Sequence, residues 1–326
     1  MRRRAEPALA VAVLGVSTPF AYWGFHLVRA IVEAVAGPTL ALHTTGLAEL
    51  RAGSARRDGG NVVMSSDLPD AELARFVSGA DLPVIVFSDD AGLMFDWTMQ
   101  SRGLGAQDAA RLCSRVCSSL SPALEARRRL VVAPLAAPAE VVSAILAFLW
   151  PRRSGGLESL AFEPPAPCGP VACGLLRTEM TAALAAYADL TLGRKPDEIV
   201  WPLSLFTRGD GRSWRAPFDL AGPARALLYG PYMHLPVGDW TARVEFEIAG
   251  ALSGVEATTD VRTHEVVTQK AFALPAKGVF AYDLSFAVRD PHHPVEIRLF
   301  LRKAAIEGVF LARSVKLRPQ RRAAAL

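Results

Sequence analysis

The sequence predicts an α/β domain on a parallel sheet, followed by an antiparallel β-sandwich of jelly-roll type. Three observations support this prediction. Over residues 1–150, short apolar runs alternate with helical patterns, which is typical of a parallel sheet with helices on both faces. Residues 151–198 form a linker rich in proline and glycine that contains one helix. Over residues 199–326 the apolar positions recur every second residue, as in strands with one buried and one wet face.

The first domain begins with the apolar run Ala8–Val16, which predicts a buried strand. A helix is expected over Tyr22–Ala36, because apolar residues recur at helical spacing and Gly37-Pro38 follows as a stop signal. Further elements are expected in alternation: strands at Thr39–His43, Asn61–Met64, Pro83–Phe87 and Leu130–Ala133, and helices at Ala71–Val77, Ala106–Arg128 and Val141–Trp150.

One amphipathic helix, about Leu175–Leu192, is expected between the two domains. In the second domain, alternating patterns predict strands at Trp240–Ile248, Phe280–Val288, Val295–Leu301 and Val309–Leu317. Proline and glycine turn signals separate these strands, as in a sandwich.

The charge pattern argues against nucleic acid as a partner. The chain has 36 basic and 32 acidic residues, a formal net charge of +4. A nucleic-acid binder gathers its basic residues on one face, whereas the clusters here are short and far apart. They are Arg2–Arg4, Arg127–Arg129, Arg152–Arg153 and Arg321–Arg322.

The four cysteines, Cys113, Cys117, Cys168 and Cys173, lack nearby histidines at zinc-site spacing. We therefore expect free thiols in a reducing compartment, and no metal. The expected location is cytoplasmic.

The alternative is export through an N-terminal signal peptide, because an arginine-rich start precedes the apolar run at Ala8–Val16. No stretch reaches the ~20 uncharged apolar residues that span a bilayer. We expect that the protein is not an integral membrane protein, and the sequence leaves its oligomeric state open.

The first strand-to-helix turn, Gly15–Gly24, is where an α/β domain of this kind would bind a phosphorylated ligand. A phosphate-binding loop needs small residues and a cation. This turn has no lysine or arginine, and it carries Phe20, Tyr22 and Trp23 instead. The Walker and Gly-x-Gly-x-x-Gly patterns are absent as well, so we expect no cofactor.

The pattern over about residues 8–120 nonetheless resembles the sulfotransferase family, whose P-loop-like fold binds a 3′-phosphorylated sulfonate donor. The segment Val13-Leu-Gly-Val-Ser-Thr-Pro19 looks like the family's first strand and donor loop. The segment Pro83–Asp90 looks like the strand that carries the family's Arg-Asp-Pro segment. On this alignment Ser17 and Thr18 would contact the donor, while Phe20 and Ser88 stand where the two anion-binding cations belong. The resemblance therefore implies a degenerate donor site.

Two further residues are candidates for catalysis. His43 ends a strand near the expected cleft, where it is either a base or a histidine held by the strand end. Asp89 and Asp90 follow a central strand, and together with Asp96 they could form an acidic cluster. The alternative role for an aspartate at this turn is to cap the next helix.

The segment Tyr229–Trp240 combines aromatic residues and turn formers, and it looks like the strand-entry segment of carbohydrate-binding-type sandwich modules. Sugar sites combine aromatic faces with a few polar groups. The candidate sugar-binding residues are Trp214, Tyr229, Tyr232 and His234. Trp240 lies on the buried face of its strand and is expected in the core.

Together these observations predict a glycan-associated protein with a degenerate sulfotransferase-like domain, which binds or modifies a bacterial surface polysaccharide. One alternative is an active sulfotransferase, or another transferase, with a divergent donor site. The other is a non-catalytic protein-interaction scaffold.

Overall fold

The computed structural model describes residues 8–54, 60–134, 137–153, 156–160, 162–209, 217–250 and 255–320. The chain forms two compact units, each made of several chain segments. The first contains Met1–Leu104, Ser119–Val171 and Ala188–Arg194, and the second contains Gly105–Ser118, Ala172–Tyr187 and Lys195–Leu326. The predicted fold class is confirmed, because the first unit holds a parallel sheet with helices and the second holds two antiparallel sheets.

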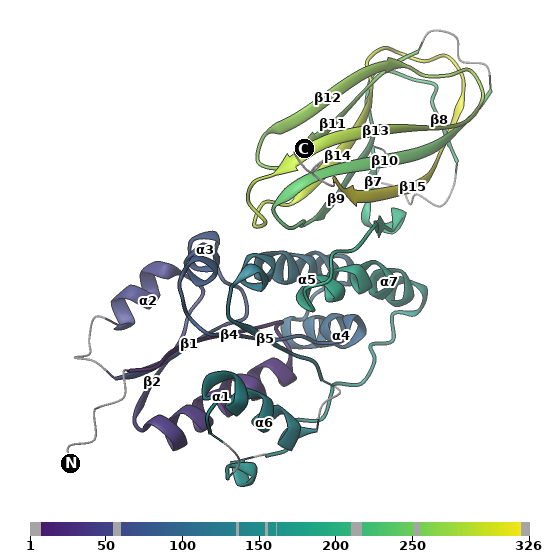
Figure 1. Cartoon of the computed structure of the whole chain (residues 1–326). Helices are drawn as coiled ribbons and strands as arrows, with labels where there is room; N and C mark the ends of the chain where they lie inside the picture. Colours follow the sequence, from purple (N-terminus) through teal and green to yellow (C-terminus); the bar gives the residue numbers. More distant parts are fainter. Residues whose placement is uncertain are drawn as a thin grey trace, which may run out of the picture. The chain divides into compact units, whose positions relative to one another are not determined.

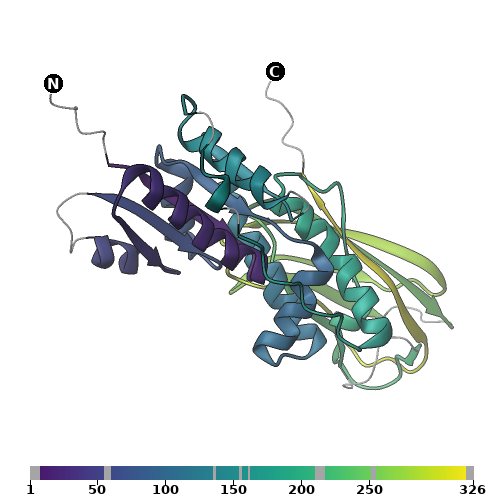
Figure 2. The same ribbon diagram turned by 90° about the horizontal axis from the view of Figure 1, so that it is seen from below.

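The first unit is built on a five-stranded parallel sheet with the order β2-β3-β1-β4-β5. Its strands are β1 (Ala10–Gly15), β2 (Thr39–His43), β3 (Asn61–Ser66), β4 (Val84–Phe87) and β5 (Arg129–Val132). Helices α1 (Pro19–Ala36) and α6 (Pro138–Leu149) lie on one face, and α2 (Leu47–Ser54) and α3 (Ala71–Gly79) on the other (Figure 1). In the view from below, α1 and α6 lie side by side in front of the strands (Figure 2). Helix α4 (Ala91–Arg102) follows β4, and the 3-10 turns η1 (Ser121–Glu125) and η2 (Glu158–Leu160) belong to the same unit.

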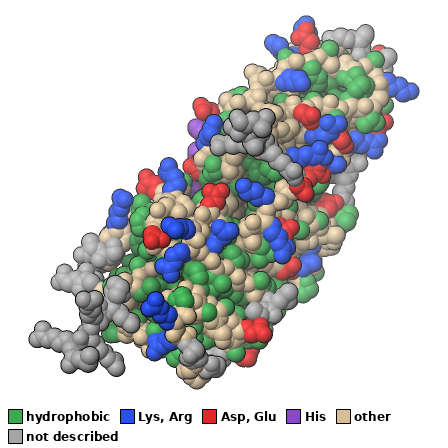
Figure 3. Space-filling view, viewed as in Figure 1, with side chains coloured by type: hydrophobic (Ala, Val, Ile, Leu, Met, Phe, Trp, Pro, Cys, Tyr) green, Lys and Arg blue, Asp and Glu red, His purple; other side chains and the backbone are tan. Residues whose placement is uncertain are grey.

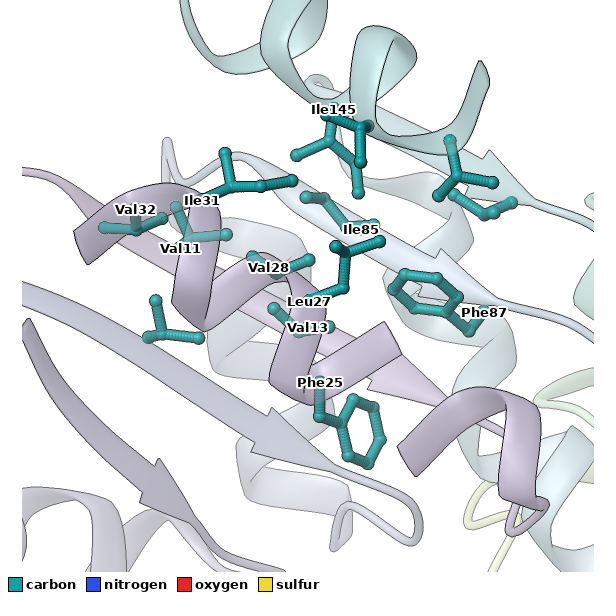
Figure 4. Packing of buried hydrophobic residues seen from close by; sticks show 14 of the residues in the cluster. Val11, Val13, Phe25, Leu27, Val28, Ile31, Val32, Ile85, Phe87 and Ile145 are labelled. Atoms are coloured by element: carbon teal, nitrogen blue, oxygen red, sulfur yellow. The ribbon is translucent and has the colours of Figure 1, made fainter. Parts of the chain in front are cut away.

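Helix α1 begins with a side-chain cap. The hydroxyl of Thr18 accepts a hydrogen bond from the backbone N–H of Ala21, and Pro19 occupies the first turn, where its missing N–H costs nothing. The apolar side of α1 then packs on the sheet. Val28 and Ile31 are fully buried and point toward the strand residues Val11, Val13 and Ile85, with Ile145 of α6 beside them (Figure 4).

The helix expected over Ala106–Arg128 is shorter in the structure. Helix α5 covers Ala106–Leu120 and then gives way to η1, which contains Pro122 in its first turn. A proline has no N–H to donate inside an α-helix and its ring clashes with the preceding turn, which explains the early end.

The second unit is a β-sandwich of two antiparallel sheets, grouped with α5 up to Ser118 and with α7 (Gly174–Thr191) up to Tyr187. One sheet has the order β13-β10-β15-β6, with β8 also paired to β15. The other has the order β12-β11-β14-β9-β7. The strands are β6 (Ile199–Trp201), β7 (Thr207–Arg208), β8 (Phe218–Asp219), β9 (Ala226–Met233), β10 (Gly238–Ala249), β11 (Glu256–Arg262), β12 (Val266–Ala273), β13 (Gly278–Val288), β14 (Val295–Leu301) and β15 (Val309–Pro319), and the 3-10 turn η3 covers Leu203–Leu205.

The sandwich core is aromatic at its centre. The rings of Phe246 and Phe310 are stacked at 5.5 Å, and the predicted core position of Trp240 is confirmed by its exposure of 3%. The outer surface is mixed in charge, with basic and acidic side chains lying among each other over the sandwich in Figure 3. Within the part of the chain that the structure describes, no helix has the length and apolar character needed to cross a bilayer.

Candidate functional site

The carboxyl ends of β1, β3 and β4 are the place where a ligand of the α/β unit would be expected. From β1 the chain moves to β2 and β3 on one side of the sheet, and from β3 it crosses β1 to reach β4 and β5 on the other side. Open α/β sheets bind ligands at such a reversal of strand order, beyond the carboxyl ends of the strands.

Asp67, one residue beyond β3, is the centre of a polar cluster at this edge. Its carboxylate oxygen Oδ2 accepts hydrogen bonds from the hydroxyl of Ser17 at 2.9 Å and from the hydroxyl of Tyr22 at 2.7 Å. Both donors come from the turn and helix that follow β1. Asp67 was not among the predicted site residues, and its position directly after a strand was the only signal for it in the sequence.

His43, at the end of β2, contacts the other oxygen of the same carboxylate. Its Nε2 atom lies 3.7 Å from Oδ1 of Asp67, and its Nδ1 atom lies 3.1 Å from the hydroxyl of Ser65. The ring packs against Tyr22 and Phe25, and half of the side chain is exposed. Partners at the strand end therefore hold His43, and its ring is half exposed beside a carboxylate, while its role as a base stays a prediction.

The hydroxyl of Tyr22 is a persistent hydrogen-bond donor. Burial, followed by its hydrogen bond to Asp67 and the charge of that carboxylate, raises the pKa of Tyr22 to about 12, although the positive charge of Arg102 acts in the opposite direction. The phenol therefore stays protonated at physiological pH.

Asp89 lies on the β4 side of the same edge. Its carboxylate is bound by the hydroxyl of Thr18 and by the backbone N–H of Asp90, and its exposure is 6%. Burial raises the pKa of Asp89 above its ordinary value. The role of helix cap falls to Asp90, whose carboxylate accepts from the N–H groups of Gly92 and Leu93. The third acidic residue, Asp96, accepts from the N–H of Val171 instead.

Ser88 faces away from this edge. Its hydroxyl is buried and lies 2.5 Å from the hydroxyl of Thr191, at the end of α7. On the sulfotransferase alignment this is the position of a donor-binding arginine, and here it contributes to internal packing.

Two of the three aromatic residues in the first turn belong to the core. Phe20 and Trp23 are stacked at 5.4 Å and both pack against Phe87, while the indole N–H of Trp23 donates to the carbonyl of Phe162. Tyr22 is the one whose polar end reaches the cluster around Asp67.

A groove of about 310 Å³ adjoins His43, between α1 and the strands β2 and β3. Helix α1 provides one wall and the two strands provide the other. Its lining combines apolar walls with imidazole, guanidinium and hydroxyl groups: Tyr22, Phe25, His26, Arg29, Ala41, His43, Val63 and Ser65.

The sandwich carries a second candidate site, on the outer face of the sheet β12-β11-β14-β9-β7. Register places Tyr229 of β9, Arg298 of β14, Asp260 of β11 and Gln269 of β12 side by side in one row across four strands. The alternate positions on β14, Ile297 and Leu299, are fully buried, so this row lies on the outer side of the sheet.

Arg298 joins the members of this row. Its guanidinium forms two hydrogen bonds with the carboxylate of Asp260, at 2.7 and 2.8 Å, and lies 5.2 Å from the ring centre of Phe300. The hydrogen bond to Asp260 is the main reason why the pKa of Arg298 is raised further. We refer to Tyr229, Arg298, Asp260, Gln269 and Phe300 as the outer row.

The predicted sugar-binding residues differ in burial and in their hydrogen-bond partners. Tyr229 is half-buried in the outer row. Tyr232 is also half-buried, with its hydroxyl 2.8 Å from Glu296 and its ring 5.3 Å from the guanidinium of Arg111. Burial, followed by the hydrogen bond and charge of Glu296, raises the pKa of Tyr232 to about 12. Trp214 lies outside the described residues.

His234 is an internal residue. Its exposure is 7%, its Nδ1 atom lies 2.8 Å from the carbonyl oxygen of Pro291, and its backbone N–H donates to the hydroxyl of Ser114 in α5. Burial lowers the pKa of His234 to about 4. A neutral, buried ring of this kind holds the Pro291 turn in place.

No group of three or more histidine, cysteine, aspartate or glutamate side chains in the described ranges is arranged to hold a metal ion. Cys113 and Cys117 are buried thiols outside any disulfide, and burial raises the pKa of Cys117 well above its ordinary value.

The chain matches no family model and no curated protein. Among solved structures it is similar to an arabinose-bound α-L-arabinofuranosidase, MgGH51 (TM-score 0.25, 12% identity, 32% of this chain and 19% of that one). It is also similar to the module TmCBM61 in complex with β-1,4-galactotriose (TM-score 0.25, 10% identity, 32% and 69%). A third is the C-terminal CBM6 of LamC, a marine laminarinase from Zobellia galactanivorans (TM-score 0.22, 11% identity, 35% and 97%). The resemblance of the first unit to sulfotransferases stays a prediction.

Proposed function

We propose that this chain is a glycan-binding protein and that the outer row of the sandwich is its saccharide surface. The observation that carries the proposal is the row itself, in which Tyr229 and Phe300 lie beside Arg298, Arg298 is paired with Asp260, and exposed Gln269 stands at the end.

A saccharide offers two kinds of surface, and the row has a match for each. The C–H face of a sugar ring packs on aromatic rings, and its hydroxyls need donors and acceptors nearby. Arg298 and Gln269 supply N–H donors and the side-chain carbonyl of Gln269 accepts, while the buried carboxylate of Asp260 is paired with Arg298. Because Arg298 is held by Asp260, little side-chain freedom is lost when it meets a ligand.

The α/β unit, in this proposal, is a degenerate sulfotransferase-like domain that does not bind a 3′-phosphoadenosine donor. Acidic side chains flank the expected donor position, with Asp67 beyond β3 and Asp89 beyond β4. Ser88 is turned into the interior, and a cap from Thr18 already uses the N–H of Ala21 in the first turn of α1. Each charge-assisted contact that a donor would miss removes roughly 1.5–3 kcal/mol of binding.

A second candidate function is supported by a different observation. The His43–Asp67 contact lies at the edge of the 310 Å³ groove, which is an arrangement suited to general base chemistry on a bound ligand. An active transferase with a divergent donor site would use this groove. The non-catalytic scaffold remains the third possibility, and it predicts neither saccharide nor nucleotide binding.

The proposal is tested with the full chain on a panel of neutral and acidic polysaccharides by affinity gel electrophoresis and calorimetry. Loss of one aromatic contact of about 1–2 kcal/mol should weaken binding roughly 5- to 30-fold. We expect this loss in Tyr229→Ala and in Phe300→Ala. Tyr232→Ala, beside the row, should weaken binding less.

The matched control is Phe76→Ala, which removes an exposed aromatic ring from α3 of the other unit. It should bind as the wild type does. Melting temperatures of all variants separate lost contacts from lost folding. If the wild type is retained by no glycan, or if both variants of the row bind normally, the saccharide surface is wrong.

The donor-site part is tested separately, by calorimetric titration with adenosine 3′,5′-bisphosphate. We expect no binding in the micromolar range. A micromolar dissociation constant would favour the active transferase and leave the saccharide surface untouched.

A further inference from the structure

Two histidines from different turns of the sandwich meet at its surface. His264 lies in the turn between β11 and β12, and His293 lies in the turn between β13 and β14. Their Nδ1 atoms are 3.1 Å apart and their ring centres 4.6 Å apart, although 29 residues separate them. The two turns adjoin neighbouring strands. His264 follows the end of β11 and His293 precedes the start of β14, and in the sheet Arg262 of β11 is paired with Glu296 of β14.

The separation of the two nitrogens is the one that a shared metal ion would impose. With metal–nitrogen bonds of about 2.0–2.1 Å, nitrogens 3.1 Å apart subtend an angle of about 98° at the ion. This value lies between the angles of octahedral and tetrahedral coordination. The N–N separation is therefore compatible with one ion bound by both rings.

Each turn is held by hydrogen bonds of its own. The carboxylate of Asp290 accepts from the N–H of His292 and the Asp290 carbonyl accepts from that of His293, while Pro291 contacts the buried ring of His234. On the other side, the N–H of Thr263 donates to the carbonyl of Glu265. Ligands that are already held in place lose little freedom on binding.

Two polar groups lie beside the ring of His264, and the first is the hydroxyl of Thr263, 3.4 Å from its Nδ1 atom. The carboxylate of Glu265 lies 3.8 Å from Nε2 of His264, the ring nitrogen that points away from His293. Histidines that bind metals commonly have a carboxylate beside the second ring nitrogen, which orients the ring and raises its basicity.

We propose that His264 and His293 form a two-histidine site for a late first-row divalent metal ion, of the class of Zn²⁺, Ni²⁺ and Cu²⁺. Two imidazole ligands select these ions over Mg²⁺ and Ca²⁺, which prefer oxygen. Water completes the coordination sphere. The ion joins the β11–β12 turn to the β13–β14 turn and so fastens one end of the sandwich. This proposal does not depend on saccharide binding.

The competing explanation for the short contact is a direct hydrogen bond, in which one imidazole N–H donates to the unprotonated nitrogen of the other. That arrangement needs no metal, and it predicts no saturable metal binding at this place. The two explanations therefore differ in a measurement that uses the metal alone.

The experiment is calorimetric titration of the untagged full chain with ZnCl₂ and with CuCl₂ in a non-coordinating buffer near neutral pH. All proteins carry Cys168→Ser and Cys173→Ser, so that these partly exposed thiols do not compete. We expect one ion per chain with a micromolar dissociation constant. His264→Gln and His293→Gln should each weaken binding by at least about tenfold, and the Cu²⁺ spectrum by electron paramagnetic resonance should lose its two-nitrogen signature.

His26→Gln is the control, because His26 is an exposed histidine of the other unit. It should bind metal as the parent does. Addition of Zn²⁺ should also raise the melting temperature of the parent and of His26→Gln, and leave that of His264→Gln unchanged. The proposal is overturned if the parent binds no ion in the micromolar range, or if both histidine variants bind as tightly as the parent.

Discussion

The hydroxyl of Tyr22 donates a 2.7 Å hydrogen bond to the carboxylate of Asp67, which lies 45 residues further along the chain. The bond joins the first turn of α1 to the end of β3, across the edge of the sheet where the strand order reverses. It also brings the phenol into contact with the ring of His43. The stability of this edge and the candidate site there therefore involve the same few groups.

Replacing Tyr22 by phenylalanine should destabilise the α/β unit by about 1–2 kcal/mol, because a buried carboxylate loses one of its two hydroxyl donors. Urea unfolding monitored by circular dichroism measures this loss. Tyr229→Phe in the sandwich is the control and should leave the unfolding of the α/β unit unchanged. Equal unfolding curves for Tyr22→Phe and the wild type would show that the bond contributes nothing.

The same variant should change the alkaline limb of the stability curve. The pKa of Tyr22 is about 12 in the fold, above the reference value of 10, so the neutral phenol is favoured by folding. Its contribution is complete below pH 10 and is lost as the pH rises through 12. The wild type should therefore lose more stability between pH 10 and 12 than Tyr22→Phe does, in unfolding curves taken at a series of pH values. Parallel losses would contradict the assigned shift.

His234 should make the sandwich sensitive to acid. Burial lowers its pKa to about 4, below the reference value of 6.5, so the folded state resists protonation that the unfolded chain accepts. The contribution of neutral His234 to the free energy of unfolding is fully present above pH 6.5. It is lost as the pH drops toward 4, by up to about 3 kcal/mol. His234→Gln should flatten this part of the curve in thermal unfolding experiments. The exposed His26→Gln should keep the wild-type slope, and a wild-type slope in His234→Gln would reject the prediction.

Arg298 and Asp260 should show a strong coupling. Only 6% of the Asp260 side chain is exposed, against 20% for Arg298, so Arg298→Leu leaves a buried carboxylate without its cation. We expect a loss of about 2–4 kcal/mol for this variant, and a smaller loss for Arg298→Leu combined with Asp260→Asn. A double-mutant cycle in urea measures the coupling. Additive losses would mean that the two side chains act independently.

The extent of the sandwich unit can be tested with fragments. The predicted boundary at residue 199 would leave Trp201 without Tyr187, whose hydroxyl accepts the indole hydrogen bond at 3.1 Å. We expect a fragment of residues 172–326 to melt at a higher temperature than a fragment of residues 199–326, since it keeps this contact and the whole of α7. Equal melting temperatures would support the boundary predicted from the sequence.

Local sequence patterns were sufficient for part of the elements, but α2, α4 and the strands β9, β11 and β12 were not predicted. The strand at Thr39–His43 and the helix that ends before Gly37 follow from runs of apolar residues and stop signals, which act over a few neighbouring positions. The fold class follows from the spacing of apolar residues, which changes from alternating strand and helix patterns in the first half to a period of two residues in the second. The end of α5 at Leu120 could also have been predicted, because Pro122 is a local signal.

Contacts across strands were outside the reach of such patterns. The alternation of apolar and polar residues along a strand indicates which face of the sheet each residue occupies. It does not indicate which strand lies next to it. Strand order and register place Arg298 beside Asp260, and the folded turns bring His264 to His293. The hydrogen bond between Ser17 and Asp67 likewise depends on the pairing of β1 with β3.

The sequence by itself determined that this chain has an α/β half and a sandwich half, and it placed His43 and Tyr229 near candidate sites. Only the tertiary structure decided that Asp67 would be the partner of His43, that Tyr229 would stand in a row with Arg298, and that His234 would be buried. The physical reason is that secondary structure depends on neighbours a few residues away, whereas a site is made of side chains whose distance is set by the packing of the whole unit.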